Sequence, residues 1–265
     1  MKKSLLLTND DGYQSIGFYP LLRELSIDYN VIAVVPDGQR SWMGKSISKD
    51  KKLTIKEVVL GEFKVLACSG TPADCTQIGL YDFFETKPDL VLSGINIGTN
   101  VGHGYILSSG TVGAAIEAAI DGVKAVSVSF YIPPSIRPGI NFFDPNNYHV
   151  YENAAKITRK VSKIMLENEF DKEVDLISVN IPYEGTENSQ FEVTKPFREG
   201  YGKLFVKKDE VYIHQHLNQE MHNRFDGTDM KAVSEGKVSI TPINLDLVSK
   251  NSMESVKEIF NKNWH

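Results

Sequence analysis

The sequence has few cysteines and no long apolar run. Its 265 residues include two cysteines, Cys68 and Cys75, which are not spaced as a C-x-x-C pair. Two thiols alone cannot build a cysteine zinc site, so we expect two small buried side chains in a reducing compartment. No stretch approaches the roughly 20 apolar residues of a membrane span. The apolar run at residues 5–7 is too short for a secretory signal, so we expect a cytoplasmic protein with no membrane partner.

Positive charge is also in short supply. Lysine and arginine number 29 against 34 aspartates and glutamates, which gives a formal net charge of −5. A nucleic-acid duplex usually requires a basic face, so this balance argues against such a partner. A small phosphorylated substrate is not excluded, because a bound metal ion can supply local positive charge.

Apolar segments with strand and helix periodicity alternate along the first two-thirds of the chain. Buried strands are predicted at residues 4–8, 31–35, 89–94, 125–130 and 175–182, and helices at residues 18–25, 112–120 and 151–168. A hairpin is predicted around Gly61, and Thr71 with Pro72 is typical of a helix start. Buried strands that alternate with helices imply an α/β fold with a doubly wound, mostly parallel, Rossmann-like sheet.

The pattern changes after the last of these strands. Extended segments are predicted at residues 203–216 and 229–243, and helical spacing returns at residues 252–264. We therefore expect an α/β core over residues 1–182 and a tail over residues 183–265. The predicted hairpin of the tail carries too much apolar surface to leave in solvent. It must pack on its own core or on a second subunit.

Two adjacent carboxylates follow the first predicted strand. Asp10 and Asp11 repel each other unless a cation or hydrogen-bond donors compensate. Gly12 allows a sharp turn, so both side chains can point into one site. Ligands of doubly wound sheets bind beyond the carboxyl ends of the strands, where this pair lies. The alternative is an Asp-rich cap on the following helix.

A polar loop at residues 36–46 follows the second predicted strand. Arg40 and Lys45 could meet a phosphate, and the hydroxyl oxygen of Ser41 could bind a metal ion. The alternative is a solvated surface loop.

A glycine-rich loop follows the strand predicted at residues 89–94, and it offers the amide oxygens of Asn96 and Asn100. Ser109, Gly110 and Thr111 then open a helix. A helix start with small hydroxyl residues is an anion site because its N–H groups are unpaired, although an ordinary Ser/Thr cap has the same sequence.

These three loops are most informative together. Their donors are oxygens, which suit Mg²⁺ or Mn²⁺ better than zinc. A hard metal ion beside an anion-binding helix start predicts phosphate chemistry.

The same segments resemble the motifs of the SurE survival-protein nucleotidases, in the family's order. They are TNDDG, the PDGQRS loop, SGTPADC, PDLVLSGINIGTNVG, SSGTVGAAIEA and, from Thr228 to Ile243, TDMKAVSEGKVSITPI. The resemblance implies a divalent-metal-dependent 5′-nucleotidase, a phosphomonoesterase that hydrolyses nucleoside 5′- and 3′-monophosphates and could extend to polyphosphate. It also implies one Mg²⁺ or Mn²⁺ ion per subunit and a homo-oligomer, a dimer or tetramer that exchanges tail elements.

The resemblance assigns residues as well. It implies that the metal ligands are Asp10, Asp11, Ser41 and Asn96. It implies that the phosphate is surrounded by Asn9, Asn100, Ser109, Gly110 and Thr111, with Lys45 as a further candidate. Asp10 is the candidate to orient or deprotonate the attacking water, beside Asp11 and Asn9. Two departures stand out: Lys45 occupies a position where the family has Asn or His, and His103 one where many relatives are acidic.

Other functions are less consistent with the motifs. A dinucleotide-dependent oxidoreductase would carry G-x-G-x-x-G after the first strand, where this chain has NDDGYQSIG. An aspartyl-phosphate phosphatase would carry D-x-D there. A non-catalytic nucleotide-sensing module with the same metal and anion site remains the alternative.

His103 could act as an acid or ligand, and His214 with His216 could bind a metal, but exposed histidines are the simpler interpretation.

Overall fold

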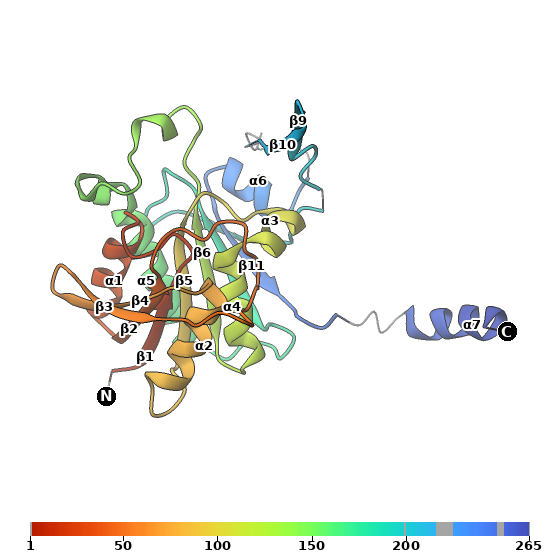
Figure 1. The fold of residues 1–265 in the computed structure, drawn as a ribbon, viewed down its shortest axis with the longest axis horizontal. Helices are drawn as coiled ribbons and strands as arrows, with labels where there is room; N and C mark the ends of the chain where they lie inside the picture. The colour runs from red at the N-terminus through yellow and green to blue at the C-terminus, as the bar shows by residue number, and fades with distance from the viewer. Residues whose placement is uncertain (1, 199, 216–224, 248–251, 265) are drawn as a thin grey trace.

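The computed structural model describes residues 2–198, 200–215, 225–247 and 252–264. Within these residues, nine strands form one sheet in the order β3-β4-β2-β1-β5-β6-β7-β11-β8. They are β1 Ser4–Thr8, β2 Asn30–Pro36, β3 Ile55–Leu60, β4 Phe63–Cys68, β5 Leu90–Ile97, β6 Ala125–Phe130, β7 Leu176–Ile181, β8 Phe191–Val193 and β11 Val238–Ile243. Neighbours pair in parallel except β3 with β4 and β7 with β11. The predicted α/β class with a mostly parallel, doubly wound sheet is confirmed (Figure 1).

Helices cover both faces of the sheet. The four long helices of the core are α1 Phe18–Ser26, α2 Pro72–Asp82, α4 Gly110–Ile120 and α5 Glu152–Glu167. Leu5 and Leu7 of β1 lie in the core cluster with α1 and α5, whereas Leu6 lies in the cluster with α2 and α4. Successive side chains of a strand point to opposite faces, so the run at residues 5–7 serves both cores. The predicted helices are confirmed.

Local signals explain where the helices begin. At α2 the Thr71 hydroxyl oxygen accepts a hydrogen bond from Asp74 N at 3.1 Å, and Thr71 N donates to the Asp74 carboxylate at 2.8 Å. This capping box satisfies two N–H groups of the first turn. Pro72 occupies the first helical position, where no N–H partner is needed. The predicted helix start is therefore confirmed.

The excursion between β6 and α5 holds short helices that periodicity did not predict. Two 3-10 helices, η1 Arg137–Gly139 and η2 Pro145–Tyr151, precede α5. Tyr151 is fully buried, and its ring lies 4.8 Å from that of Phe130. A further short helix, α3 Gly102–Ser108, connects the glycine-rich loop to α4.

The tail contributes to the sheet and also extends beyond it. β11 inserts between β7 and β8, and the hairpin of β9 Phe205–Lys208 and β10 Val211–His214 forms a separate two-stranded sheet. The extended prediction for residues 229–243 is wrong over α6 Asp229–Ser234, which is helical. The Thr228 hydroxyl caps that helix, and Met230 and Val233 pack on Phe197.

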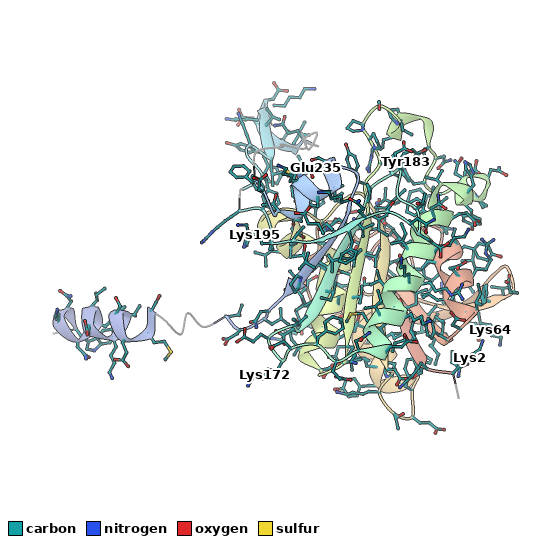
Figure 2. All side chains as sticks on the ribbon, turned by 180° about the vertical axis from the view of Figure 1, so that it is seen from behind. Lys2, Lys64, Lys172, Tyr183, Lys195 and Glu235 are labelled. Atoms are coloured by element: carbon teal, nitrogen blue, oxygen red, sulfur yellow. The ribbon has the colours of Figure 1, made fainter. Side chains whose placement is uncertain are left out.

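The last helix, α7 Met253–Asn263, confirms the helix predicted at residues 252–264. It stands apart from the sheet in both views, and none of its side chains is buried (Figures 1 and 2). None of the helices formed by the described residues is long and apolar enough to cross a membrane.

Candidate active site

Asp10 and Asp11 lie just beyond the end of β1 and are almost completely buried, at 4% and 2% exposure. The Thr111 hydroxyl donates to Asp10 Oδ1 at 2.5 Å. Gln39 Nε2 donates to Asp11 Oδ1 at 3.1 Å, and Ile97 N donates to Asp11 Oδ2 at 2.9 Å. The turn after β1, the loop after β2, the last residue of β5 and the first turn of α4 therefore meet at the two carboxylates, as the sheet topology predicts.

The charge of the pair is only partly compensated by these donors. The pKa of Asp10 is raised to about 7, chiefly by burial and also by the nearby charge of Asp11, while the hydrogen bond from Thr111 opposes the rise. Burial also raises the pKa of Asp11, against the hydrogen bonds from Ile97 and Gln39 and the attraction of Arg137. A divalent cation would supply the missing positive charge, so the pair fits a metal ion.

Asn9 shapes the turn that presents the carboxylates. Its side-chain nitrogen donates to Gly12 O and its side-chain oxygen accepts from Gly12 N, each at 3.0 Å. Gly12 has φ +83°, in the left-handed region that glycine adopts without strain. Both polar atoms of Asn9 are thus engaged in positioning Asp10 and Asp11.

The first turn of α4 presses directly against Asp10. A Cβ added to Gly110 would lie 2.9 Å from Asp10 Cβ and 3.0 Å from Pro72 Cγ, so only glycine allows this approach. The Ser109 hydroxyl accepts from Val112 N at 3.1 Å and caps the helix. The hydroxyls of Ser109 and Thr111 and the N–H groups of Val112 and Gly113 all have partners within the chain. An anion at this helix start would therefore meet the N–H groups that precede Val112.

The residues next to Ser41 and Asn96 contact the pair: Arg40 through its backbone, and Ile97 as described above. Arg40 N donates to Asp10 O at 2.6 Å, which fixes the backbone next to the exposed Ser41. Asn96 Nδ2 donates to Gly98 O at 2.8 Å. Since that bond uses the amide nitrogen, the side-chain oxygen of Asn96 is the atom that could bind a cation.

Asn100 and Lys45 have partners that the sequence did not indicate. Asn100 N donates to Asn180 Oδ1 at 2.8 Å, and Asn100 Nδ2 donates to Ser129 Oγ at 2.7 Å, which ties the loop to β6 and β7. Lys45 Nζ lies 2.5 Å from the carboxylate of Glu117 on α4. A phosphate that bound Lys45 would share it with this buried carboxylate.

Three contributors escaped the sequence analysis. Gln39 lies in the polar loop, whose many polar residues gave no reason to single it out. Arg137 belongs to the excursion before α5, which carries no motif, yet its charge opposes the rise in the pKa of Asp11. Asp229 is fully buried and accepts hydrogen bonds from Gly102 N at 2.7 Å and Phe197 N at 3.0 Å. Asp229 could have been singled out because it lies inside the C-terminal motif, from Thr228 to Ile243.

Among the described residues, no histidine or cysteine completes a metal-binding group with the two aspartates. His103 is exposed, and its Nδ1 lies 3.1 Å from Phe197 O. His214 lies in β10, and His216 lies outside the described residues. Cys68 and Cys75 are buried free thiols, as expected. No group of three His, Cys, Asp or Glu side chains in the described part of the chain could hold a metal, so a metal site here rests on two carboxylates and neutral oxygens.

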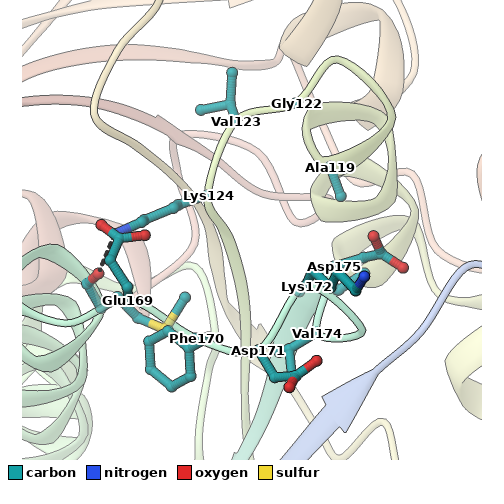
Figure 3. A pocket seen from close by; sticks show the side chains of 12 residues that line it. Ala119, Gly122, Val123, Lys124, Glu169, Phe170, Asp171, Lys172, Val174 and Asp175 are labelled. Carbon is teal, nitrogen blue, oxygen red and sulfur yellow. Dashed lines mark hydrogen bonds and ion pairs between the residues drawn. The ribbon is translucent and has the colours of Figure 1, made fainter.

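A cavity of about 240 Å³ lies away from this site, among residues at the start of β6 and β7 and the end of α5 (Figure 3). Lys124, one of the two lysines that line it, is held by Glu169 at 3.0 Å and by the backbone oxygen of Asn168 at 2.9 Å. This cavity lies at the amino-terminal ends of β6 and β7, at the opposite edge of the sheet from Asp10 and Asp11.

Known proteins match this chain over nearly its whole length. A profile of the family described as Survival protein SurE matches residues 5–203. A protein of Methanococcoides burtonii named 5′-nucleotidase SurE is 34% identical over 264 residues, which cover 98% of this chain and 100% of that protein. A protein of Methanoregula boonei with the same name is 37% identical over 269 residues, which cover 99% and 100%.

A solved structure agrees with these matches. The structure titled "Crystal Structure of Sure Protein from Aquifex aeolicus" superimposes with a TM-score of 0.79 at 32% identity, over 97% of this chain and 99% of that one. The matching profile, the relatives aligned from end to end and the shared fold all give the same result: this chain belongs to the SurE family.

Proposed function

We propose that the chain is a divalent-metal-dependent 5′-nucleotidase that hydrolyses nucleoside monophosphates to nucleoside and phosphate. Relatives aligned over nearly the whole chain carry the name 5′-nucleotidase. The observation that carries the proposal is the buried Asp10 and Asp11 pair, set against the first turn of α4. The 3′-monophosphates and polyphosphate are proposed as further substrates, on the resemblance alone.

The residues divide into a metal-binding set and an anion-binding set. Asp10, Asp11, Ser41 and Asn96 would hold one Mg²⁺ or Mn²⁺ ion, whose oxygen preference fits these donors. When bound, that ion supplies positive charge to the phosphate and makes a bound water more acidic.

The chain itself positions the reactants. The N–H groups that precede Val112 at the start of α4 would receive the phosphate oxygens beside Asp10. Thr111 holds Asp10 Oδ1, so the other carboxylate oxygen is available to orient the attacking water. Asn9 keeps both aspartates in place through the Gly12 turn.

A homo-oligomer held by the tail is also part of the proposal. The hairpin leaves Phe205, Val211 and Tyr212 at 51%, 59% and 69% exposure. The apolar residues of α7 are exposed as well, namely Met253, Val256, Ile259, Phe260 and Trp264. A dimer or tetramer would cover such surfaces by exchanging tail elements. We place the protein in the cytoplasm, where free thiols such as Cys68 and Cys75 persist.

Phosphate release from AMP tests the enzyme against the non-catalytic nucleotide sensor. Protein stripped with EDTA should release no phosphate, and added Mn²⁺ or Mg²⁺ should restore release. A metal-loaded protein that binds AMP without hydrolysing it would favour the sensor. Full activity after metal stripping would refute metal dependence.

Light scattering tests the oligomer. The full-length chain should have the mass of a dimer or tetramer at micromolar concentration, and deletion of residues 202–215 or of residues 252–265 should lower that mass. A full-length monomer would refute the proposal. An unchanged mass in both deletions would move the interface away from the tail.

A further inference from the structure

Five aromatic rings meet beside the proposed active site. We call them the aromatic cluster, and they are Trp42, Tyr105, Tyr201, Phe205 and His214. The ring of Trp42 lies 5.7 Å from Tyr105, 5.4 Å from Tyr201 and 5.1 Å from His214, measured between centroids. Tyr105 and Tyr201 meet edge to face at 5.1 Å, and Phe205 packs on His214 at 5.4 Å. Trp42 is therefore the centre of the cluster.

Trp42 and Tyr105 belong to the two segments that carry Ser41 and lead to Ser109. Trp42 directly follows Ser41, and Tyr105 lies in α3, which leads into the Ser109 cap of α4. Gly44 N donates to Ser108 O at 2.9 Å, which fastens the loop after β2 to the end of α3. The loop that carries Ser41 and the helix that leads to Ser109 are thus joined by a backbone hydrogen bond next to these rings.

The aromatic cluster is also close enough to share a substrate with Asp10. Arg40 N contacts Asp10 O at 2.6 Å, and Trp42 is two residues further along. Since successive Cα atoms are about 3.8 Å apart, the Cα of Trp42 lies within about 8 Å of that of Arg40. Trp42 is thus two residues along the chain from a backbone contact with Asp10, near enough for one nucleotide to reach both.

Trp42 is held open to solvent in an uncommon conformation. Its side chain is 41% exposed and its φ is +62°, a left-handed value that is rare for a bulky residue. A ring whose only role was packing would gain by deeper burial. Met43, the next residue, and Leu107 of α3 are 39% and 69% exposed, so further apolar side chains of these two segments are uncovered.

We propose that the aromatic cluster binds the nucleobase of the substrate, with Trp42 and Tyr105 stacking on it while the phosphate lies at the start of α4. The proposal rests on the proposed nucleotidase function and adds to it the surface that recognises the nucleoside. Stacking uses the π face that every base has, so it is tolerant of base identity. The expected substrate class is therefore nucleoside monophosphates of all bases, with purines preferred for their larger stacking area.

Direct binding tests the proposal without any turnover. The chain has two tryptophans, so Trp264→Phe leaves Trp42 as the sole fluorophore. With Mg²⁺ present, the phosphonate analogue of AMP should quench this emission in a saturable way. The matching ribose phosphonate, which lacks the base, should not. Equal quenching by both compounds, or by neither, overturns the proposal.

Kinetics provide the second readout. Trp42→Ala should raise the KM for AMP at least tenfold, with a much smaller change in kcat and a loss on ribose 5-phosphate at least tenfold smaller. Trp42→Phe, which keeps a stacking face, should restore most of the affinity. Tyr212→Ala is the matched control, because Tyr212 is an exposed hairpin ring outside the aromatic cluster. Equal losses on AMP and ribose 5-phosphate in Trp42→Ala would show that the ring only braces the Ser41 loop, which overturns the proposal.

The two proposals can fail separately. Base-dependent quenching without hydrolysis of AMP supports the base site and refutes the nucleotidase. Hydrolysis of AMP without base-dependent quenching supports the nucleotidase and refutes the base site.

Discussion

The carboxylate site and the C-terminal tail are held in place by different means. Asp10 and Asp11 are buried and fixed by Thr111, Gln39 and a backbone amide. The side chains of α7 are all exposed and make no comparable contacts with the sheet. The site is therefore determined by contacts within one chain, whereas the apolar surface of the tail is not satisfied within the described part of the chain.

Burial explains why this difference matters. A carboxylate pair removed from water is costly unless its partners are placed well, so small changes near Asp10 should have large effects. An exposed helix tolerates change because water remains its neighbour. The predictions below test that difference, beginning with the largest expected effect.

Asp10→Asn and Asp11→Asn should each lower the rate of phosphate release from AMP by at least about a hundredfold. Each removes a metal-binding charge and relieves the repulsion between the carboxylates, so thermal stability in EDTA should be unchanged or higher. Asp209→Asn is the control, since Asp209 is an exposed carboxylate in the tail hairpin. Wild-type rates in both site variants would reduce the pair to a helix cap.

Gly110→Ala should lower kcat/KM by about tenfold to a hundredfold, because the new methyl group would displace Asp10 or the helix start. Gly200→Ala is the matched control in the tail, where an added Cβ meets nothing within 4 Å. Comparison of the two variants by steady-state kinetics isolates the steric effect. Equal activity in both variants would show that the first turn of α4 can move away from Asp10 without consequence.

Asp229→Asn should lower the free energy of unfolding by about 1 to 3 kcal/mol, because a buried N–H group loses its acceptor. Burial raises the pKa of Asp229, against hydrogen bonds from Gly102, Phe197 and Met230. A raised pKa in the folded state favours folding at low pH. The wild-type protein should therefore lose part of its advantage over Asp229→Asn as the pH rises from about 4 through that raised pKa.

Denaturant unfolding of both proteins between pH 4 and pH 7 measures this advantage directly. An advantage that grew with pH would mean that the pKa of Asp229 is lowered in the folded protein.

Deletion of residues 252–265 should change the free energy of unfolding of the monomer by less than about 0.5 kcal/mol, because no side chain of α7 is buried. The measurement is denaturant unfolding at low protein concentration, where an oligomer would dissociate. A large loss of stability under those conditions would show that α7 packs on its own core.

Most of the fold could be predicted from the sequence because its signals are local. Buried runs such as residues 4–8 and 125–130 give strands, and the Thr71 capping box gives the start of α2. The short helices α3 and α6 could not be predicted. Gly102 and Gly104 lower the intrinsic helix propensity of α3, so this short helix depends on contacts with distant residues. One such contact is the hydrogen bond from Gly102 N in the first turn of α3 to the carboxylate of Asp229 in α6.

The candidate site shows a similar division. Asp10 and Asp11 could be found because they are adjacent in sequence and follow a buried strand. Gln39 and Arg137 could not be found in this way, because they are far from the aspartates in sequence and no motif connects them. The sequence also could not show that Thr111 is hydrogen-bonded to Asp10 or that Lys45 faces Glu117, since both contacts depend on how α4 packs.

The position of β11 has a consequence for synthesis on the ribosome. All six residues of β7 are buried, and β11 covers one of its edges, yet β11 is made some 60 residues later. Until residues 238–243 emerge, β7 is an open, apolar edge that another nascent chain could pair with. A chain truncated before residue 238 would contain every proposed metal ligand, but it should aggregate during translation.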